Sequence, residues 1–147
     1  KNKYEKHFYD LNIEWLNNFF EVEEYDHKIL SNAQKYIIDK GGKIFFAVLG
    51  DKIIATVALM PTENELTYEL TKMAVKPKYR NKGVGKKLLN KCIEFSNYIG
   101  YESIILYSNK KLKNAIHLYK SFGFEEIKME IKSPYSRADI KMIKKFY

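Results

Sequence analysis

The spacing of apolar side chains predicts two helices in the first forty residues. Between Phe8 and Phe20 the apolar residues recur at intervals of three and four, which is the period of a helix with one buried face. A second helix is predicted over about residues 32–38, ending at the glycine pair 41–42, because glycine commonly terminates helices. Residues 21–26 hold four acidic side chains in six positions and are interpreted as a solvated connection.

Runs of β-branched and aromatic residues predict a meander of three antiparallel strands after these helices. The first two runs, residues 44–49 and 52–60, are separated only by Gly50-Asp51, which has the chemistry of a tight hairpin turn. Residues 61–64 form a further turn, and residues 65–75 alternate loosely enough to continue the sheet. The third strand therefore ends directly before a glycine-containing loop.

The second half of the chain predicts a helix, a strand, a helix and two strands. An amphipathic pattern runs from Val84 to Ile99, and the almost wholly apolar run at residues 103–107 is typical of a strand covered on both faces. A strand, a helix and a strand in this order predict a crossover between parallel strands. A short helix is expected at about residues 113–121, and strands at about 124–131 and 140–146 flank a turn at 133–136.

These elements together predict an α/β (α+β) fold in a single domain of residues 1–147. We expect a central mixed, mostly antiparallel sheet of about six strands, flanked by about four helices. A chain of 147 residues is long enough to bury the core of one such domain.

The loop between the third strand and the next helix has the chemistry of an anion site. The first amides of a helix have no partner inside the helix, and the helix dipole adds about half a positive charge there. The absence of side chains at Gly83 and Gly85 lets a ligand approach the backbone. A dinucleotide-binding G-x-G-x-x-G motif is excluded because Leu88 occupies the third glycine position, and no Walker motif is present.

Residues 80–85, Arg-Asn-Lys-Gly-Val-Gly, resemble the [RQ]-x-x-G-x-[GA] signature of the GCN5-related N-acetyltransferase (GNAT) family. In that family the loop holds the pyrophosphate of coenzyme A. The stretch from Asn114 to Phe124 looks like the family's N-x-x-A-x-x-[LF]-Y-x-x-x-G-F motif, with the departure that Ala115 directly follows Asn114. The order of predicted elements is also that of the family, so the resemblance spans nearly the whole chain, as in small single-domain members.

The resemblance implies an acetyl-CoA-dependent N-acetyltransferase that moves an acetyl group to a primary amine by direct transfer in a ternary complex. It implies backbone contacts from the third strand to the pantetheine arm, a pyrophosphate loop, and contacts near the thioester. The residues implied to bind the cofactor, acetyl-CoA (coenzyme A), are Met73, Ala74, Val75, Arg80, Asn81, Lys82, Gly83, Val84, Gly85, Lys86, Asn109, Asn114 and Tyr119.

The chemistry of acetyl transfer suggests two catalytic residues. An amine with a pKa of ~10 must lose a proton before it attacks a thioester, and Glu69, four residues before Met73, is the candidate general base. Glu65, Glu23, Glu24 and water are the alternatives. By its place in the second motif, Tyr119 is the candidate phenol that protonates the departing thiolate.

The acidic segment suggests the class of acceptor. In proteins of this fold the first two helices and their connection form one wall of the acceptor cleft. Glu23, Glu24 and Tyr25 would lie on that wall, and carboxylates there favour a cationic acceptor such as a polyamine or a lysine-like amine.

Two other functions stay open. Residues 76–147 hold seventeen of the basic residues and six of the acidic ones in a chain of net charge +8, which permits a nucleic-acid-binding domain. That function is disfavoured because the lysines are dispersed without a run of five. An acyl-CoA-binding regulatory module that has lost turnover is the other alternative.

The remaining features indicate a soluble protein. We expect a cytoplasmic monomer or homodimer, since no apolar run approaches a membrane span and no secretion signal is evident. We expect no metal site, because the three histidines are scattered, and a buried thiol at Cys92.

Overall fold

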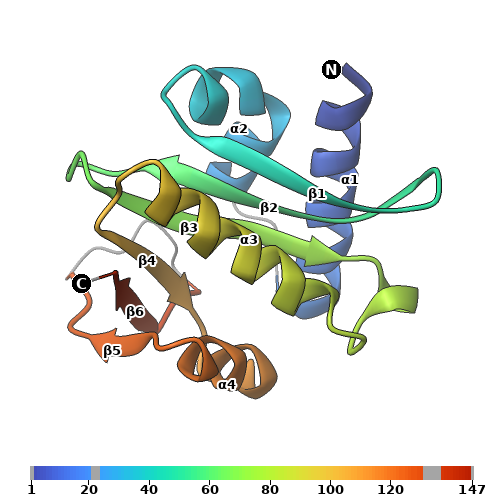
Figure 1. Cartoon of the computed structure of the whole chain (residues 1–147). Helices are drawn as coiled ribbons and strands as arrows, with labels where there is room; N and C mark the ends of the chain where they lie inside the picture. Colours follow the sequence, from blue (N-terminus) through green and yellow to red (C-terminus); the bar gives the residue numbers. More distant parts are fainter. Residues whose placement is uncertain (1, 21–23, 131–136, 147) are drawn as a thin grey trace.

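A computed structural model describes residues 2–20, 24–130 and 137–146 (Figure 1). Along the chain the elements are α1 (Asn2–Phe19), α2 (Glu24–Ser31), the π-helical turn η1 (Gln34–Ile38), β1 (Lys43–Leu49), β2 (Lys52–Pro61), β3 (Thr67–Val75), the 3₁₀ turn η2 (Pro77–Tyr79), α3 (Val84–Tyr98), β4 (Ser103–Ser108), α4 (Lys113–Ser121), β5 (Glu125–Ile127) and β6 (Ile140–Lys145).

The strands form one six-stranded sheet in the order β1-β2-β3-β4-β6-β5. The pair β3–β4 is parallel, as the predicted crossover through α3 requires, and the other neighbours are antiparallel. Helices α1 and α2 cover one face of the sheet and α3 covers the other (Figure 1). The predicted fold class, a mixed and mostly antiparallel sheet of about six strands with about four helices, is confirmed.

Each face of the sheet carries its own core. On one side, Leu88, Leu89 and Cys92 of α3 pack on the sheet. On the other side, Phe8 and Leu16 of α1 pack with the buried side chains of α2 and η1. Strand β2 is buried along almost its whole length because it is covered from both sides, and this explains its continuous apolar sequence.

The first part of the chain differs from the prediction in two ways. Helix α1 begins at Asn2, earlier than the apolar pattern indicated. The predicted connection over residues 21–26 is wrong in its second half, because Glu24–Ser31 forms α2, and the predicted helix over 32–38 is reduced to η1. Helix α2 forms because Ile29 and Leu30 pack against α1. Asp26 on the same helix is also buried, and its charge is paired with Lys72 and Arg137, which are distant in the sequence. Residues 21–23 lie outside the described residues.

The last predicted strand pair is shorter than expected. Strand β5 ends at Ile127, which faces Lys141 in β6, and β6 itself begins only one residue earlier, at Ile140. Because the two strands are antiparallel, β5 ends beside the residues at which β6 begins. Residues 131–136, which include the predicted turn, lie outside the described residues.

A gap opens in the sheet between β3 and β4. The two strands pair only from Thr67–Ser103 to Leu70–Leu106. Beyond this point β3 contains a bulge, in which its register with β2 shifts and Lys72 takes a left-handed conformation with φ of 58°. A bulge re-aims the side chains and amides of a strand. The carboxyl end of β3 is thereby separated from β4, and the residues that line the smaller of two cavities surround this gap.

Candidate active site

The start of α3 has the backbone geometry that the predicted anion site requires. Gly83 precedes the helix with φ of 84°, a left-handed conformation that glycine adopts without strain. The first backbone bond of the helix runs from the Lys87 N–H to the Gly83 carbonyl, at 3.1 Å. The amides of Val84, Gly85 and Lys86 therefore precede the helical hydrogen-bond ladder and lie at its positive end.

Arg80, the first residue of the loop motif, fixes the loop in place. Its Nε donates to the Val75 carbonyl at the end of β3, at 2.8 Å, and its Nη2 donates to Glu14 Oε1 of α1, at 2.6 Å. The side chain thus connects the loop to both the sheet and α1. This positions the amides at the start of α3.

A cavity of about 720 Å³ lies against this loop. Gly85 borders it, and a Cβ atom at this position would meet only the Met73 Sδ, at 3.6 Å. The missing side chain therefore leaves room between the loop and β3. Eight of the residues predicted to bind the cofactor line this cavity: Val75, Arg80, Asn81, Gly83, Val84, Gly85, Lys86 and Asn114.

Other predicted residues lie elsewhere, and some lining residues were missed. Ala74 is buried in a cluster with Leu11 and Ile53, and neither Ala74 nor Lys82 lines this cavity. The sequence interpretation missed Lys111 and Lys113, whose position directly before the second motif was the available signal.

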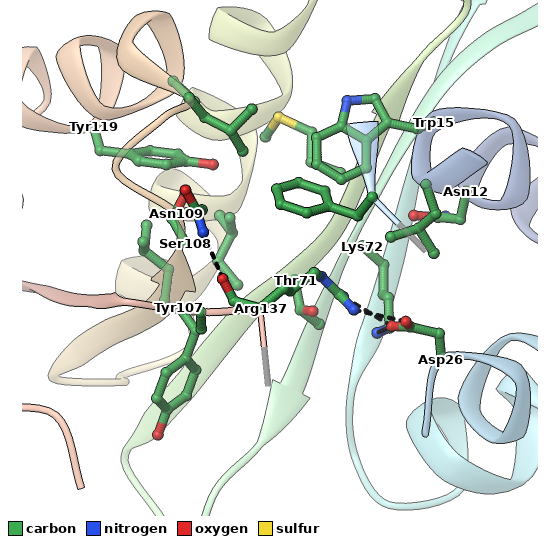
Figure 2. A pocket seen from close by; sticks show the side chains of 18 of the residues that line it. Asn12, Trp15, Asp26, Thr71, Lys72, Tyr107, Ser108, Asn109, Tyr119 and Arg137 are labelled. Atoms are coloured by element: carbon green, nitrogen blue, oxygen red, sulfur yellow. Dashed lines mark hydrogen bonds and ion pairs between the residues drawn. The ribbon is translucent and has the colours of Figure 1, made fainter. Parts of the chain in front are cut away.

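A second cavity, of about 220 Å³, occupies the gap between β3 and β4 (Figure 2). The predicted residues Met73, Asn109 and Tyr119 line it. It adjoins the larger cavity, because both are lined by Trp15, Val75, Arg80, Leu112 and Ala115. A ligand could therefore extend from the start of α3 into the gap in the sheet.

Tyr119 directs its hydroxyl into the smaller cavity from α4 (Figure 2). Burial raises the pKa of this phenol to about 12. Because the pKa lies so far above neutrality, Tyr119 keeps its proton at ordinary pH and can act as a proton donor, whereas it cannot act as a base.

An ion cluster that the sequence did not predict forms another wall of the smaller cavity. Asp26 of α2 accepts a hydrogen bond from Lys72 Nζ at 3.1 Å and two from Arg137, at 2.7 Å from Nη1 and 2.9 Å from Nη2. Burial lowers the pKa of Lys72, and the charge of Asp26 opposes that shift. The Arg137 carbonyl in turn accepts a hydrogen bond from Asn109 Nδ2 at 2.6 Å.

Among the residues predicted as base and acceptor wall, the described side chains of Glu69, Glu65 and Tyr25 line neither cavity. Glu69 is 8% exposed on β3 and lines neither cavity, although its charge opposes the lowering of the Lys72 pKa. Glu65 is exposed in the turn before β3. Tyr25 places its ring 5.5 Å from Lys72 Nζ. Glu24 begins α2, while Glu23 lies outside the described residues.

Residues 2–20, 24–130 and 137–146 contain neither a metal-ligand cluster nor a membrane-spanning helix. No group of three or more His, Cys, Asp or Glu side chains in these ranges could hold a metal ion. None of their helices combines the length and apolar character needed to cross a membrane.

The amino-acid sequence matches a known family. A sequence model described as the acetyltransferase (GNAT) family matches residues 7–124. The chain belongs to this family. Over 100 residues this GNAT chain is 36% identical to an N-acetylaspartate synthetase of Xenopus tropicalis. The aligned region covers 67% of the chain and 36% of that protein. Over 84 residues it is 39% identical to a probable N-acetyltransferase 14 of the same species, covering 56% of the chain and 41% of that protein.

Solved structures agree on the fold. A GNAT-family acetyltransferase from Staphylococcus aureus superposes with a TM-score of 0.88 at 24% identity, covering 100% of this GNAT chain and 96% of that one. PaiA N-acetyltransferase from Thermoplasma acidophilum, solved in complex with coenzyme A, gives a TM-score of 0.74 at 18% identity, with coverage of 97% and 92%. The GNAT fold expected from the sequence motifs is thus confirmed, and the chain spans little more than a third of the length of the N-acetylaspartate synthetase it matches.

Proposed function

We propose that this chain is an acetyl-CoA-dependent N-acetyltransferase that acts on a primary amine by direct transfer in a ternary complex. The observation that carries the proposal is the pair of adjoining cavities, which run from the amides at the start of α3 to the gap between β3 and β4. Family membership supports the reaction class.

The larger cavity fits a polyphosphate cofactor of this kind. The amides at the start of α3 and the lysines Lys86, Lys111 and Lys113 provide the positive charge that a pyrophosphate needs. Gly85 keeps the path toward Met73 open. When bound, acetyl-CoA supplies an acetyl group activated as a thioester. Structural neighbours solved with coenzyme A support this choice of cofactor.

Direct transfer is favoured because the one cysteine of the sequence lines neither cavity. Cys92, the one cysteine in the sequence, is fully buried in the core beneath α3, and burial raises its pKa to about 12. A thiol without access or thiolate character cannot carry an acetyl group. Adjoining cavities would instead hold both substrates side by side, so that proximity supplies a large part of the rate enhancement.

Tyr119→Phe should lower kcat about 10²-fold while leaving coenzyme A affinity nearly unchanged, because only a proton donor is removed. The raised pKa predicts that the deficit stays constant from about pH 6 to about pH 9, since the phenol remains protonated throughout that range. Steady-state kinetics at several pH values, with coenzyme A titrations, measure both quantities. Equal turnover of the two proteins would leave Tyr119 with a packing role.

Glu69→Gln tests the proposed general base. If Glu69 takes the amine proton through water, the substitution should depress the rate most at low pH, where the amine is hardest to deprotonate. Because Glu69 lies outside the cavity linings, its path to the amine would need at least one water. A pH profile that matches wild type would assign the proton to water or to another group.

The class of acceptor expected from the acidic segment stays a prediction. It rests on Glu23 and Glu24, whose side chains lie outside what the structure describes, and on Tyr25, which lines neither cavity. The names of the relatives include an N-acetylaspartate synthetase, but this chain spans only 36% of that protein, so we carry over acetylation of an amine without its substrate.

The experiment that tests the function is incubation with acetyl-CoA and a panel of amines while free thiol is followed. Thiol release that depends on an amine is expected. Binding of acetyl-CoA without release in any combination would support the regulatory module instead. Binding to DNA or RNA that weakens steeply with salt, without thiol release, would favour the nucleic-acid function.

A further inference from the structure

The charged groups that a ligand can meet in the smaller cavity are cations. The charged residues among its described lining are Asp26, Lys72, Arg80 and Arg137. The side chains of Asp26 and Lys72 are 0% and 3% exposed, whereas those of Arg137 and Arg80 are 19% and 21% exposed. The carboxylate therefore lies behind the cluster, and the guanidinium groups lie in front of it.

Arg137 is held in place at three points. Asp26 accepts a hydrogen bond from each of its terminal nitrogens, Asn109 Nδ2 donates to its carbonyl, and the ring of Phe20 lies 5.8 Å from the guanidinium carbon. A fixed guanidinium loses little freedom when it binds a second planar anion, which favours affinity. Two basic side chains, Lys72 and Arg137, also share the single Asp26 carboxylate.

The position and size of the cavity restrict what the guanidinium would meet. Arg137 and Tyr119 reach the same cavity from separate elements, the C-terminal segment and α4 (Figure 2). An acceptor amine must lie near the Tyr119 end, where the cavity joins the one lined by the α3 loop. A volume of about 220 Å³ suits a small molecule whose other end would lie beside Arg137.

We propose that the acceptor is a small amine that also carries a carboxylate, such as an amino acid, and that Arg137 determines this specificity by pairing with the carboxylate. This inference rests on the proposed function and deepens it. It is opposite to the cationic acceptor expected from the acidic segment, so a single panel of acceptors separates the two. Asp26 and Asn109 act on the acceptor only through Arg137, as positioning residues.

The test compares matched acceptors in wild type and in two variants. Alanine, aspartate and glutamate are compared with their carboxamides, with ethylamine, and with spermidine and a lysine-rich peptide. In wild type, kcat/KM for an amino acid should exceed that of its carboxamide about tenfold or more, because a charge-assisted bond is lost in the amide. Arg137→Gln should abolish this preference for the amino acid, mainly by raising the KM for the amino acid, while Arg137→Lys should retain part of the preference. Lys91→Gln, an exposed change on α3, should keep the full ratio.

Two further measurements keep the outcomes separate. Thermal stabilisation by coenzyme A in each variant reports that the fold and the larger cavity are intact, and calorimetry measures amino-acid binding to protein saturated with coenzyme A. Amino-acid binding that Arg137→Gln abolishes supports the carboxylate site even if no acceptor releases thiol, in which case only the proposed reaction fails. A preference for spermidine, equal use of acid and amide, a ratio that survives Arg137→Gln, or no amino-acid binding to wild type overturns the inference.

Discussion

Replacing Gly85 with leucine should abolish the stabilisation that coenzyme A gives to the folded protein. A ligand at about 100 times its Kd stabilises wild type by about 2.7 kcal/mol. The Cβ of any residue at this position points toward Met73 Sδ, so a leucine side chain would fill the space between the α3 loop and β3. The shift in Tm with added coenzyme A measures the loss.

Substitutions at Gly85 and Gly83 distinguish the effect of filling the space beside this loop from the effect of backbone strain. Gly85→Ala places its Cβ at an ordinary contact distance of 3.6 Å from Met73 Sδ, so this variant should fold normally and keep part of the shift. Gly83 has open space around it but a φ of 84°, so a substitution there acts through the backbone. Asn90→Leu, one turn further along α3, is the matched control and should keep the full shift. A full shift in Gly85→Leu, or none in wild type at millimolar coenzyme A, would remove the cofactor assignment.

Asp26→Asn should lower the free energy of unfolding by about 3 kcal/mol. Asp26 is fully buried and is paired with both Lys72 and Arg137, and removal of one partner leaves buried charge without compensation. Asp10→Asn removes a solvent-exposed pair with Lys6 and should cost at most about 0.5 kcal/mol. Denaturant titration of both variants measures the two changes.

The pH dependence of Asp26→Asn distinguishes charge from packing. Without Asp26, the pKa of Lys72 loses the charge that raised it and falls further below its ordinary value. Between the lowered pKa of folded Lys72 and the ordinary pKa of lysine, the unfolded chain binds a proton that the folded chain lacks, so the stability of the variant should rise with pH there, over a wider pH range than in wild type. The double variant Asp26→Leu with Lys72→Met should be more stable than Asp26→Asn. Equal pH dependence of wild type and variant would contradict the role of the ion cluster.

Regular elements could be predicted where local chemistry determines them. The predicted and observed bounds of α4 coincide at Lys113–Ser121, because an amphipathic pattern is ended by Gly123. The hairpin between β1 and β2 is fixed by Gly50, which has φ of 65°. The position of the loop at residues 80–86 directly before α3 could also be predicted, because glycines followed by an amphipathic pattern indicate a loop at the start of a helix.

The ion cluster could not be predicted because its members are far apart in the chain. Lys72 and Arg137 lie 46 and 111 positions from Asp26. A carboxylate on the buried side of α2 interrupts its apolar pattern, which made the segment resemble a solvated connection. The bulge at Lys72 carries no glycine to mark it. The place of β6 between β4 and β5 likewise follows from pairing across the sheet.

The contact between Asp26 and Arg137 also bears on the order of folding events. It closes a loop of 111 positions, whereas the hairpin of β1 and β2 closes almost at once. The entropy lost in closing a chain grows with its length, so such a contact forms after most local structure is in place. Interactions absent from the transition state contribute mainly to the barrier against unfolding. The ion cluster beside the smaller cavity should therefore slow unfolding and prolong the lifetime of the folded chain.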